Sequence, residues 1–260
     1  MTYKSLGLSN RGVNGKFRED TDHFLPKKFR WYTLGSLILL LGLGVVVAIS
    51  GLFNFLLLSV GEFALYFIYQ RKWRKLHQGI DLVGGQKADT ISFPFGRYVF
   101  LTWVYAMIME FCVDFGAYGT LNPGTVLVIM VVLTPHYFFM AAVFRLWFRW
   151  YTYSPRQAYF TMGLVGFLLE SVILKLFAGT FELSGILLFP IDVPIHMLNY
   201  GGFVLIPTFR QNQAEQREPV KTRKKYLVGI LGTLALTLPE IAGTYWFVYK
   251  VLLKENWVLR

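Results

Sequence analysis

Apolar runs of membrane-spanning length alternate with short polar connections along this chain. A helix needs about 20 mostly apolar residues to cross the hydrocarbon core of a bilayer. Residues 31–70 are too many for one span, and Ser50-Gly51 supplies the turn that divides them. The pattern predicts an all-α, polytopic integral membrane protein of about seven transmembrane helices, at 31–50, 51–70, 98–118, 124–144, 158–178, 185–206 and 226–249.

Positive charge is confined to alternate connections between these runs. Twenty-two of the 26 Lys and Arg residues fall in four segments, 1–30, 71–97, 145–156 and 207–225. The connections between them carry none, at 51–54, 119–123 and 179–184. Because basic loops stay in the cytoplasm, the N-terminus is predicted inside and the C-terminus outside. We expect a cytoplasmic segment over 1–30 and a single transmembrane domain over 31–260, in the plasma (inner) membrane.

Composition agrees with this prediction. The chain is 55% hydrophobic and 16% charged, whereas soluble domains are roughly 25% charged. The net charge of +11 lies in short loops, which indicates topology and attraction to anionic lipid rather than a nucleic-acid partner. Cys112 is the single cysteine, so neither an intrachain disulfide nor a Cys-based metal site is expected. Residues 1–30 lack an apolar core, so we expect no cleaved signal peptide.

A weak internal repeat relates the third and fourth predicted helices to the fifth and sixth. At a shift of 60 residues it aligns Phe100 with Phe160, Glu110 with Glu170, Gly119-Thr120 with Gly179-Thr180, and His136 with His196. These include the rarest residue types of the spans, in the same order. A duplicated helical hairpin is the interpretation, since parallel repeats occur in membrane folds.

Ionisable residues lie at similar depths in six of the predicted helices. Their distance from the outer end is about 10–18 Å at the rise of an α-helix, and the residues are Glu62, Glu110, His136, Glu170, Asp192, His196 and Glu240. Such residues are costly in a bilayer and usually face the bundle interior, where they mark a function. Asp192 and His196 are one helical turn apart, and Pro190 and Pro194 predict that their helix is broken or kinked.

The chemistry that suits this layer is proton transfer. Burial brings carboxyl and imidazole groups toward titration near neutrality, where general acid–base catalysis is efficient. Glu110, Glu170 and Glu240 are the acid–base candidates, with His136, His196 and Asp192 as their partners. Aromatic residues, Tyr137 and Tyr200 among them, are placed to stabilise a carbocation.

One short motif adds a resemblance. Leu238-Pro239-Glu240 is similar to the Pro-x-Glu-Glu turn of membrane lycopene cyclases, and the chain resembles small polytopic carotenoid cyclases and hydratases in size, helix count and intramembrane acids. It departs from that family at Ile241, which replaces the second acid, and it lacks the Asp-rich motif of the family's second helix. The resemblance implies cyclisation, hydration or isomerisation of an isoprenoid or carotenoid-like lipid.

Other classes of function stay open or are disfavoured. A layer of Glu, Asp and His suits a proton-coupled carrier equally, or a carrier of divalent cations, because such ligands bind Zn, Mn or Fe. A structural subunit of a membrane complex is the third alternative. Four histidines are too few for a membrane di-iron desaturase, the Asp-rich motifs of membrane prenyltransferases are missing, and no phosphate-binding loop indicates a nucleotide cofactor.

Overall fold

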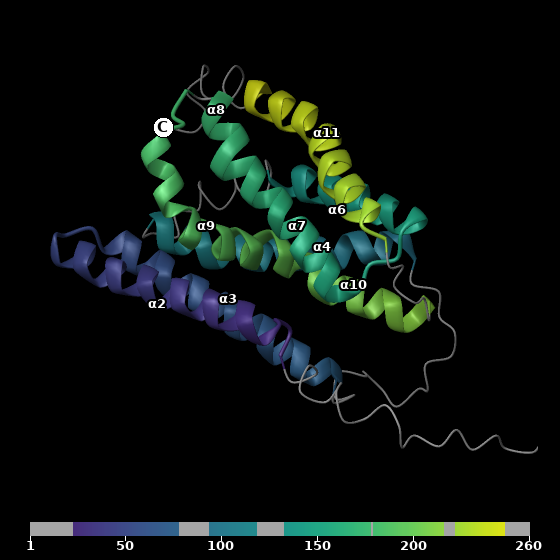
Figure 1. Cartoon of the computed structure of the whole chain (residues 1–260), viewed down its shortest axis with the longest axis horizontal. Helices are drawn as coiled ribbons and strands as arrows, with labels where there is room; N and C mark the ends of the chain where they lie inside the picture. The colour runs from purple at the N-terminus through teal and green to yellow at the C-terminus, as the bar shows by residue number, and fades with distance from the viewer. Residues whose placement is uncertain (1–22, 78–93, 119–132, 178, 216–221, 248–260) are drawn as a thin grey trace, which may run out of the picture.

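Every secondary-structure element in the described part of the chain is helical. The computed structural model describes residues 23–77, 94–118, 133–177, 179–215 and 222–247. Helices satisfy their backbone polar groups internally, as a membrane interior requires. In chain order the elements are α2 (Lys27–Ile49), α3 (Phe53–His77), α4 (Phe95–Tyr118), α6 (Thr134–Trp150), α7 (Pro155–Phe167), the π-helix η2 (Leu168–Leu174), α8 (Lys175–Phe177), the 3-10 helix η3 (Leu183–Leu188), α9 (Phe189–His196), the π-helix η4 (Met197–Gly201), α10 (Gly202–Glu215) and α11 (Lys224–Phe247) (Figure 1).

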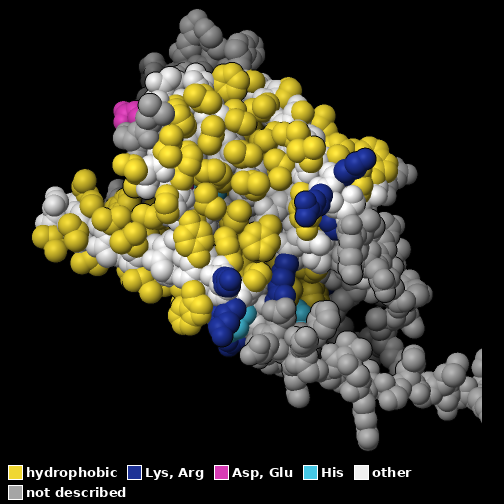
Figure 2. Space-filling view, in the orientation of Figure 1, with side chains coloured by type: hydrophobic (Ala, Val, Ile, Leu, Met, Phe, Trp, Pro, Cys, Tyr) yellow, Lys and Arg dark blue, Asp and Glu magenta, His cyan; other side chains and the backbone are white. Residues whose placement is uncertain are grey.

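The protein is a polytopic membrane protein. Five described helical stretches are long and apolar enough to cross a bilayer: α2, α3, α4, α7 continued through η2 and α8, and α11. Large apolar side chains cover their outer faces, and Ile38, Val46 and Phe53 are each 63% exposed. Figure 2 shows the same apolar surface over much of the molecule. Lipid chains accommodate such a surface, whereas in water a patch of this kind favours association.

The turn between the first two helices forms where the sequence predicts it. The N–H groups of Ser50 and Gly51 donate to Val47 and Ala48 at the end of α2. Gly51 has φ +92°, a left-handed conformation that glycine adopts without strain. Helix α3 then continues to His77, beyond the predicted end at 70, so the first basic residues of the following segment lie on its last turns. Cations there interact favourably with the carbonyl end of a helix.

The fourth and sixth predicted spans have a different form. Part of the fourth, 124–132, lies outside the described residues, and α6 continues six residues past the predicted end at 144. The sixth is divided into η3, α9, η4 and α10 and extends to Glu215. Pro190 lies in the first turn of α9 and Pro194 lies inside it, and proline removes a backbone donor at each position. The prediction was a broken or kinked helix, and the structure shows changes of helix type around these prolines with no non-helical residue between Leu183 and Glu215.

All the basic segments that the structure describes meet at one end of the bundle, which we call the basic end. Arg145, at the end of α6, lies over the ring of Tyr98, near the start of α4. Trp73, on the last turns of α3, packs against Phe209 of α10 with ring centroids 5.5 Å apart. The Tyr153 hydroxyl donates to the Lys225 carbonyl at 2.6 Å. Figure 2 shows Lys and Arg side chains gathered toward one side of the view. This grouping matches the alternation of charge along the chain, while the cytoplasmic location of the basic end stays a prediction.

Candidate functional site

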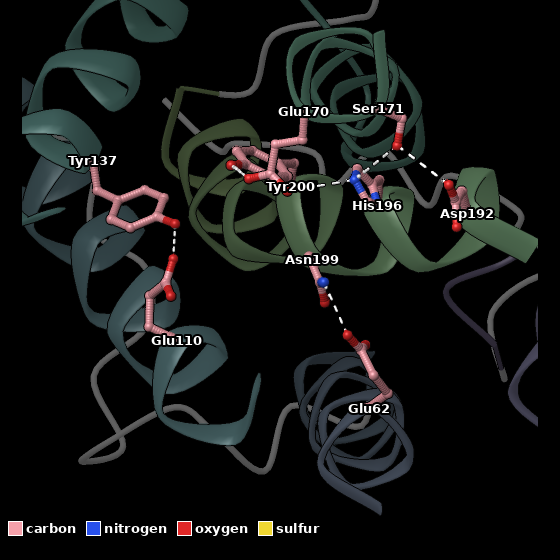
Figure 3. Close-up of polar contacts among 9 residues, drawn as sticks. All are labelled: Glu62, Glu110, Tyr137, Glu170, Ser171, Asp192, His196, Asn199 and Tyr200. Atoms are coloured by element: carbon pink, nitrogen blue, oxygen red, sulfur yellow. Dashed lines mark hydrogen bonds and ion pairs between the residues drawn. The ribbon is translucent and has the colours of Figure 1, made fainter. Parts of the chain in front are cut away.

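Glu170 lies at the centre of a polar network inside the bundle (Figure 3). The Tyr200 hydroxyl donates a hydrogen bond to Glu170 Oε1. His196 Nε2 lies 3.4 Å from Glu170 Oε2. Glu170 belongs to the π-helix η2 and Tyr200 to the π-helix η4. π-Helical turns often occur at functional sites, and here two of them pack their polar residues against each other.

Ser171 connects His196 to Asp192. The Ser171 hydroxyl donates to Asp192 Oδ2 at 3.5 Å, and its oxygen lies 3.2 Å from His196 Nε2. Because a serine has one hydroxyl proton, donation to Asp192 leaves its oxygen to accept from the imidazole N–H. Asp192 and His196 share α9, as the spacing predicts, and they are linked through this serine in η2.

Glu110 is bonded in the same manner in the preceding hairpin. The Tyr137 hydroxyl of α6 donates to Glu110 Oε1 of α4. Glu110 and Glu170, which the internal repeat aligns, therefore both accept a hydrogen bond from a tyrosine on the helix that follows. The tyrosines themselves are not aligned, because Tyr137 directly follows His136 whereas Tyr200 lies four residues after His196.

The last helix contacts α6 through His136. His136 Nδ1 lies 2.6 Å from Glu240 Oε2, so this pair links α6 to α11. The ring of His136 packs beside that of Tyr137, with centroids 5.3 Å apart. Both partners are largely buried, with side-chain exposures of 9% for His136 and 19% for Glu240.

The tyrosines of the two hairpins pack on one phenylalanine. Phe203 packs against the rings of both Tyr137 and Tyr200. The polar contacts of the six predicted site residues form three groups, in which Glu110 contacts Tyr137, His136 contacts Glu240, and Glu170, His196 and Asp192 are joined with Tyr200 and Ser171. Glu62 lies beside the Glu170 group and accepts a hydrogen bond of 3.0 Å from Asn199 Nδ2. Asp114 follows Glu110 by one helical turn on α4, and its side chain lies outside the part that the structure describes.

Access to the network differs among its carboxyls. The Glu170 side chain is 43% exposed, against 18% for the His196 that contacts it. Glu170 lies about 22 Å along the helix from Pro155, within the stretch that is long and apolar enough to span a bilayer. One carboxyl of the network is therefore accessible at a depth where the surroundings are apolar.

Sequence reasoning missed the role of four partners, namely Tyr137, Ser171, Asn199 and Tyr200. We expected the two tyrosines to contribute their ring faces, whereas they donate through their hydroxyls to Glu110 and Glu170. The available signal was proximity in sequence: each partner lies within four residues of a predicted site residue, inside an apolar run.

Among the described residues, no group of three or more His, Cys, Asp or Glu side chains is arranged to hold a metal ion. The acids are bonded instead to phenol, hydroxyl, amide and imidazole groups.

Comparison of the chain with known protein families, with curated protein sequences and with solved structures gives no match.

Proposed function

We propose that the protein is an intramembrane acid–base catalyst for an apolar, lipid-soluble substrate, with Glu170 as the group that exchanges a proton with it. The observation that carries the proposal is the geometry of Glu170. Its carboxyl is about half exposed at membrane depth, while its oxygens contact Tyr200 and His196. A substrate dissolved in the bilayer reaches such a carboxyl without crossing water.

The neighbours of Glu170 suit both directions of proton transfer. In its protonated form, Glu170 donates a proton to a substrate carbon or oxygen, and the Tyr200 hydroxyl then stabilises the carboxylate that remains. His196, held by Ser171 and Asp192, is placed to return a proton to Glu170 or to accept one from the substrate. Addition to a double bond, opening of an epoxide, and double-bond migration all need one donor and one acceptor of this kind.

An isoprenoid is the substrate class that we favour. Such lipids carry double bonds and few polar groups. An enzyme that acts on them therefore needs groups that transfer protons, and it has no charged part of the substrate to bind. Aromatic side chains surround the network, including Phe167, whose ring centroid lies 6.2 Å from that of His196. Aromatic faces stabilise positive charge that develops on a hydrocarbon. The similarity of Leu238-Pro239-Glu240 to membrane lycopene cyclases points in the same direction.

A proton-coupled carrier is the second candidate, and a specific observation favours it. Titratable groups form two short chains, Glu110 with Tyr137 and Tyr200 with Glu170 and His196, and Phe203 packs on the rings of both tyrosines. Chains of this kind carry protons in pumps and transporters. The two candidates differ in what passes through the site, because a catalyst changes a bound lipid whereas a carrier moves protons together with a solute.

The first test compares wild type with E170Q, using E182Q as the matched control because Glu182 is an exposed acid outside the network. Each protein is expressed in the same host, and the lipids of the membranes and of the purified protein are identified by mass spectrometry. The catalyst predicts a lipid product that accumulates with wild type and E182Q and is lost with E170Q.

A second measurement separates the carrier. Purified protein is reconstituted in vesicles that contain a pH-sensitive dye, and a proton gradient is applied. Solute-dependent proton flux that E170Q abolishes, with identical lipid profiles in all three strains, would replace the catalyst by the carrier. No difference among the three proteins in either measurement would leave a structural role in a membrane complex.

A further inference from the structure

A second buried polar cluster lies beside the Glu170 network and is not used by it. Glu62 on α3 is 1% exposed and accepts a hydrogen bond from Asn199 Nδ2 through Oε1 (Figure 3). Its other oxygen, Oε2, and the amide oxygen Asn199 Oδ1 are both buried without a hydrogen-bond partner in the described part of the chain. Within those residues, no Lys, Arg or His forms an ion pair with Glu62.

One proton on Glu62 would supply the missing hydrogen-bond donor and remove the unpaired charge. An ionised carboxylate is expensive to bury without a cation, and a buried acceptor without a donor adds a further cost. A protonated Glu62 has an O–H group, and the neighbouring amide oxygen of Asn199 lacks a donor. An acid and a carboxamide are complementary because each then offers one donor and one acceptor.

A line of three tyrosine side chains, Tyr66, Tyr69 and Tyr159, lies between this cluster and the basic end. Glu62, Tyr66 and Tyr69 follow the i, i+4, i+7 spacing and share one face of α3, and all three are buried. Tyr159 of α7 lies across from them. The hydroxyls of Tyr69 and Tyr159 are buried without a hydrogen-bond partner among the described residues.

Two glycines place these rings next to Asn199. The ring of Tyr69 packs on the backbone of Gly202, and Tyr159 packs on that of Gly201. Both glycines follow Asn199 within one helical turn. Tyr66 lies nearer the basic end, where the charges of Arg30 and Arg74 act on it. Tyr159 and Tyr69 therefore contact the backbone two and three residues after the Asn199 that binds Glu62.

Phe24 covers the end of this line. Its ring lies 5.6 Å from that of Tyr66, 6.4 Å from that of Tyr69 and 5.7 Å from that of Tyr159, between centroids. Arg156 holds the segment in place, since its guanidinium donates to the carbonyls of Phe24 at 3.1 Å and His23 at 2.8 Å. Phe24 itself is 1% exposed.

We propose that Glu62 and Asn199 form an internal proton-binding site, reached by a proton from the basic end past Tyr66, Tyr159 and Tyr69, with Phe24 as its cover. The proton comes from water at that end and binds the Glu62 carboxylate, and no electron moves. Other titratable groups whose charges act on Glu62 or respond to it are Glu170 of η2 and Cys112 of α4. Supply of this proton to Glu170 rests on the proposed function, whereas the site itself does not.

The test is infrared spectroscopy of the purified full-length protein, which detects the C=O stretch of a protonated carboxylic acid. Wild type should show such a band, E62Q should lose it, and E182Q should keep it. Transfer to D2O shifts the band as the carboxyl proton exchanges. F24A should speed this exchange at least several-fold over wild type, whereas F53A, which removes a lipid-facing ring 63% exposed, should not change it.

Two results would overturn the proposal. One is a spectrum of E62Q that keeps the whole protonated-carboxyl band; if E62Q does not fold, E62D takes its place and must shift the band. The other is exchange in F24A that is no faster than in F53A, which would remove the path and its cover. Neither readout needs turnover, so a lost lipid product in E170Q together with an unchanged band in E62Q would separate the two proposals.

Discussion

Tyr200 of η4 donates a hydrogen bond to Glu170 of η2, and so joins the two π-helical turns of the described chain at one carboxyl. The contact depends on a close approach of the two helices, because the ring of Tyr200 packs directly on Gly166. A side chain at 166 would occupy the position of that ring. Gly166 therefore leaves the space for the Tyr200 ring, whose hydroxyl bonds to Glu170.

We predict that G166A disrupts the Tyr200–Glu170 bond. The added methyl group overlaps the Tyr200 ring, and overpacking of this kind typically costs about 1–3 kcal/mol. Thermal unfolding in detergent should show a lower midpoint, together with loss of the lipid product. G42A is the matched control, since a Cβ at Gly42 meets nothing within 4 Å. Equal midpoints for G166A and G42A would contradict the packing argument.

The pair His136–Glu240 should show strong energetic coupling. Each partner is mostly buried, and removal of one leaves the other without its contact across the α6–α11 interface. A double-mutant cycle with H136A, E240A and the double variant should give a coupling free energy of about 0.5–3 kcal/mol. Chemical unfolding of all four proteins measures it. Additive effects of the two single substitutions would show that the 2.6 Å contact does not stabilise the fold.

The two acids that the repeat aligns, Glu110 and Glu170, should contribute similarly to stability and differently to activity. Glu110 and Glu170 each accept a hydrogen bond from a tyrosine hydroxyl, so Y137F and Y200F should destabilise the protein by similar amounts, about 0.5–1.5 kcal/mol for the loss of one hydrogen bond. Glu170 also contacts His196 and is accessible, so E170Q should lose more of the lipid product than E110Q. A larger loss of product in E110Q than in E170Q would indicate that Glu110, and not Glu170, is the reacting group.

Gly51 should not tolerate a side chain. Its φ of +92° is left-handed, and an L-residue there costs roughly 1–2 kcal/mol. G51A should therefore lower the free energy of unfolding by about that amount, although a Cβ at Gly51 meets nothing within 4 Å. G35A, at a position with the same open space and ordinary helical φ, is the control. A neutral G51A would mean that the α2–α3 turn adopts another conformation.

The predicted orientation can be tested by labelling single cysteines. In a C112A background, H77C lies at the basic end and T180C at the opposite end, and both positions are exposed. A membrane-impermeant maleimide should label T180C in intact cells and H77C only after permeabilisation. The reverse result would invert the topology that the charge distribution predicts.

The sequence by itself determined the number and order of the helices, and the reason is local. A span of about 20 apolar residues must form a helix in lipid, whatever its neighbours are. The glycine turn at Gly51 and the changes of helix type around Pro190 and Pro194 are likewise local, because they follow from what each backbone permits. Depth along a helix is also fixed by residue number, so the shared layer of Glu110, Glu170 and Glu240 followed from counting.

Only the tertiary structure decided which groups meet. Spacing along a helix does not tell which neighbouring helix a side chain faces, so Glu240 with His136, and Glu170 with Tyr200, were not predicted as pairs. Asn199 and Tyr200 lie in the π-helical turn η4 and bond to acids on other elements, Glu62 on α3 and Glu170 in η2. The same packing encloses Glu62 and leaves Glu170 accessible, a difference that two similar residues at similar depths do not reveal in sequence.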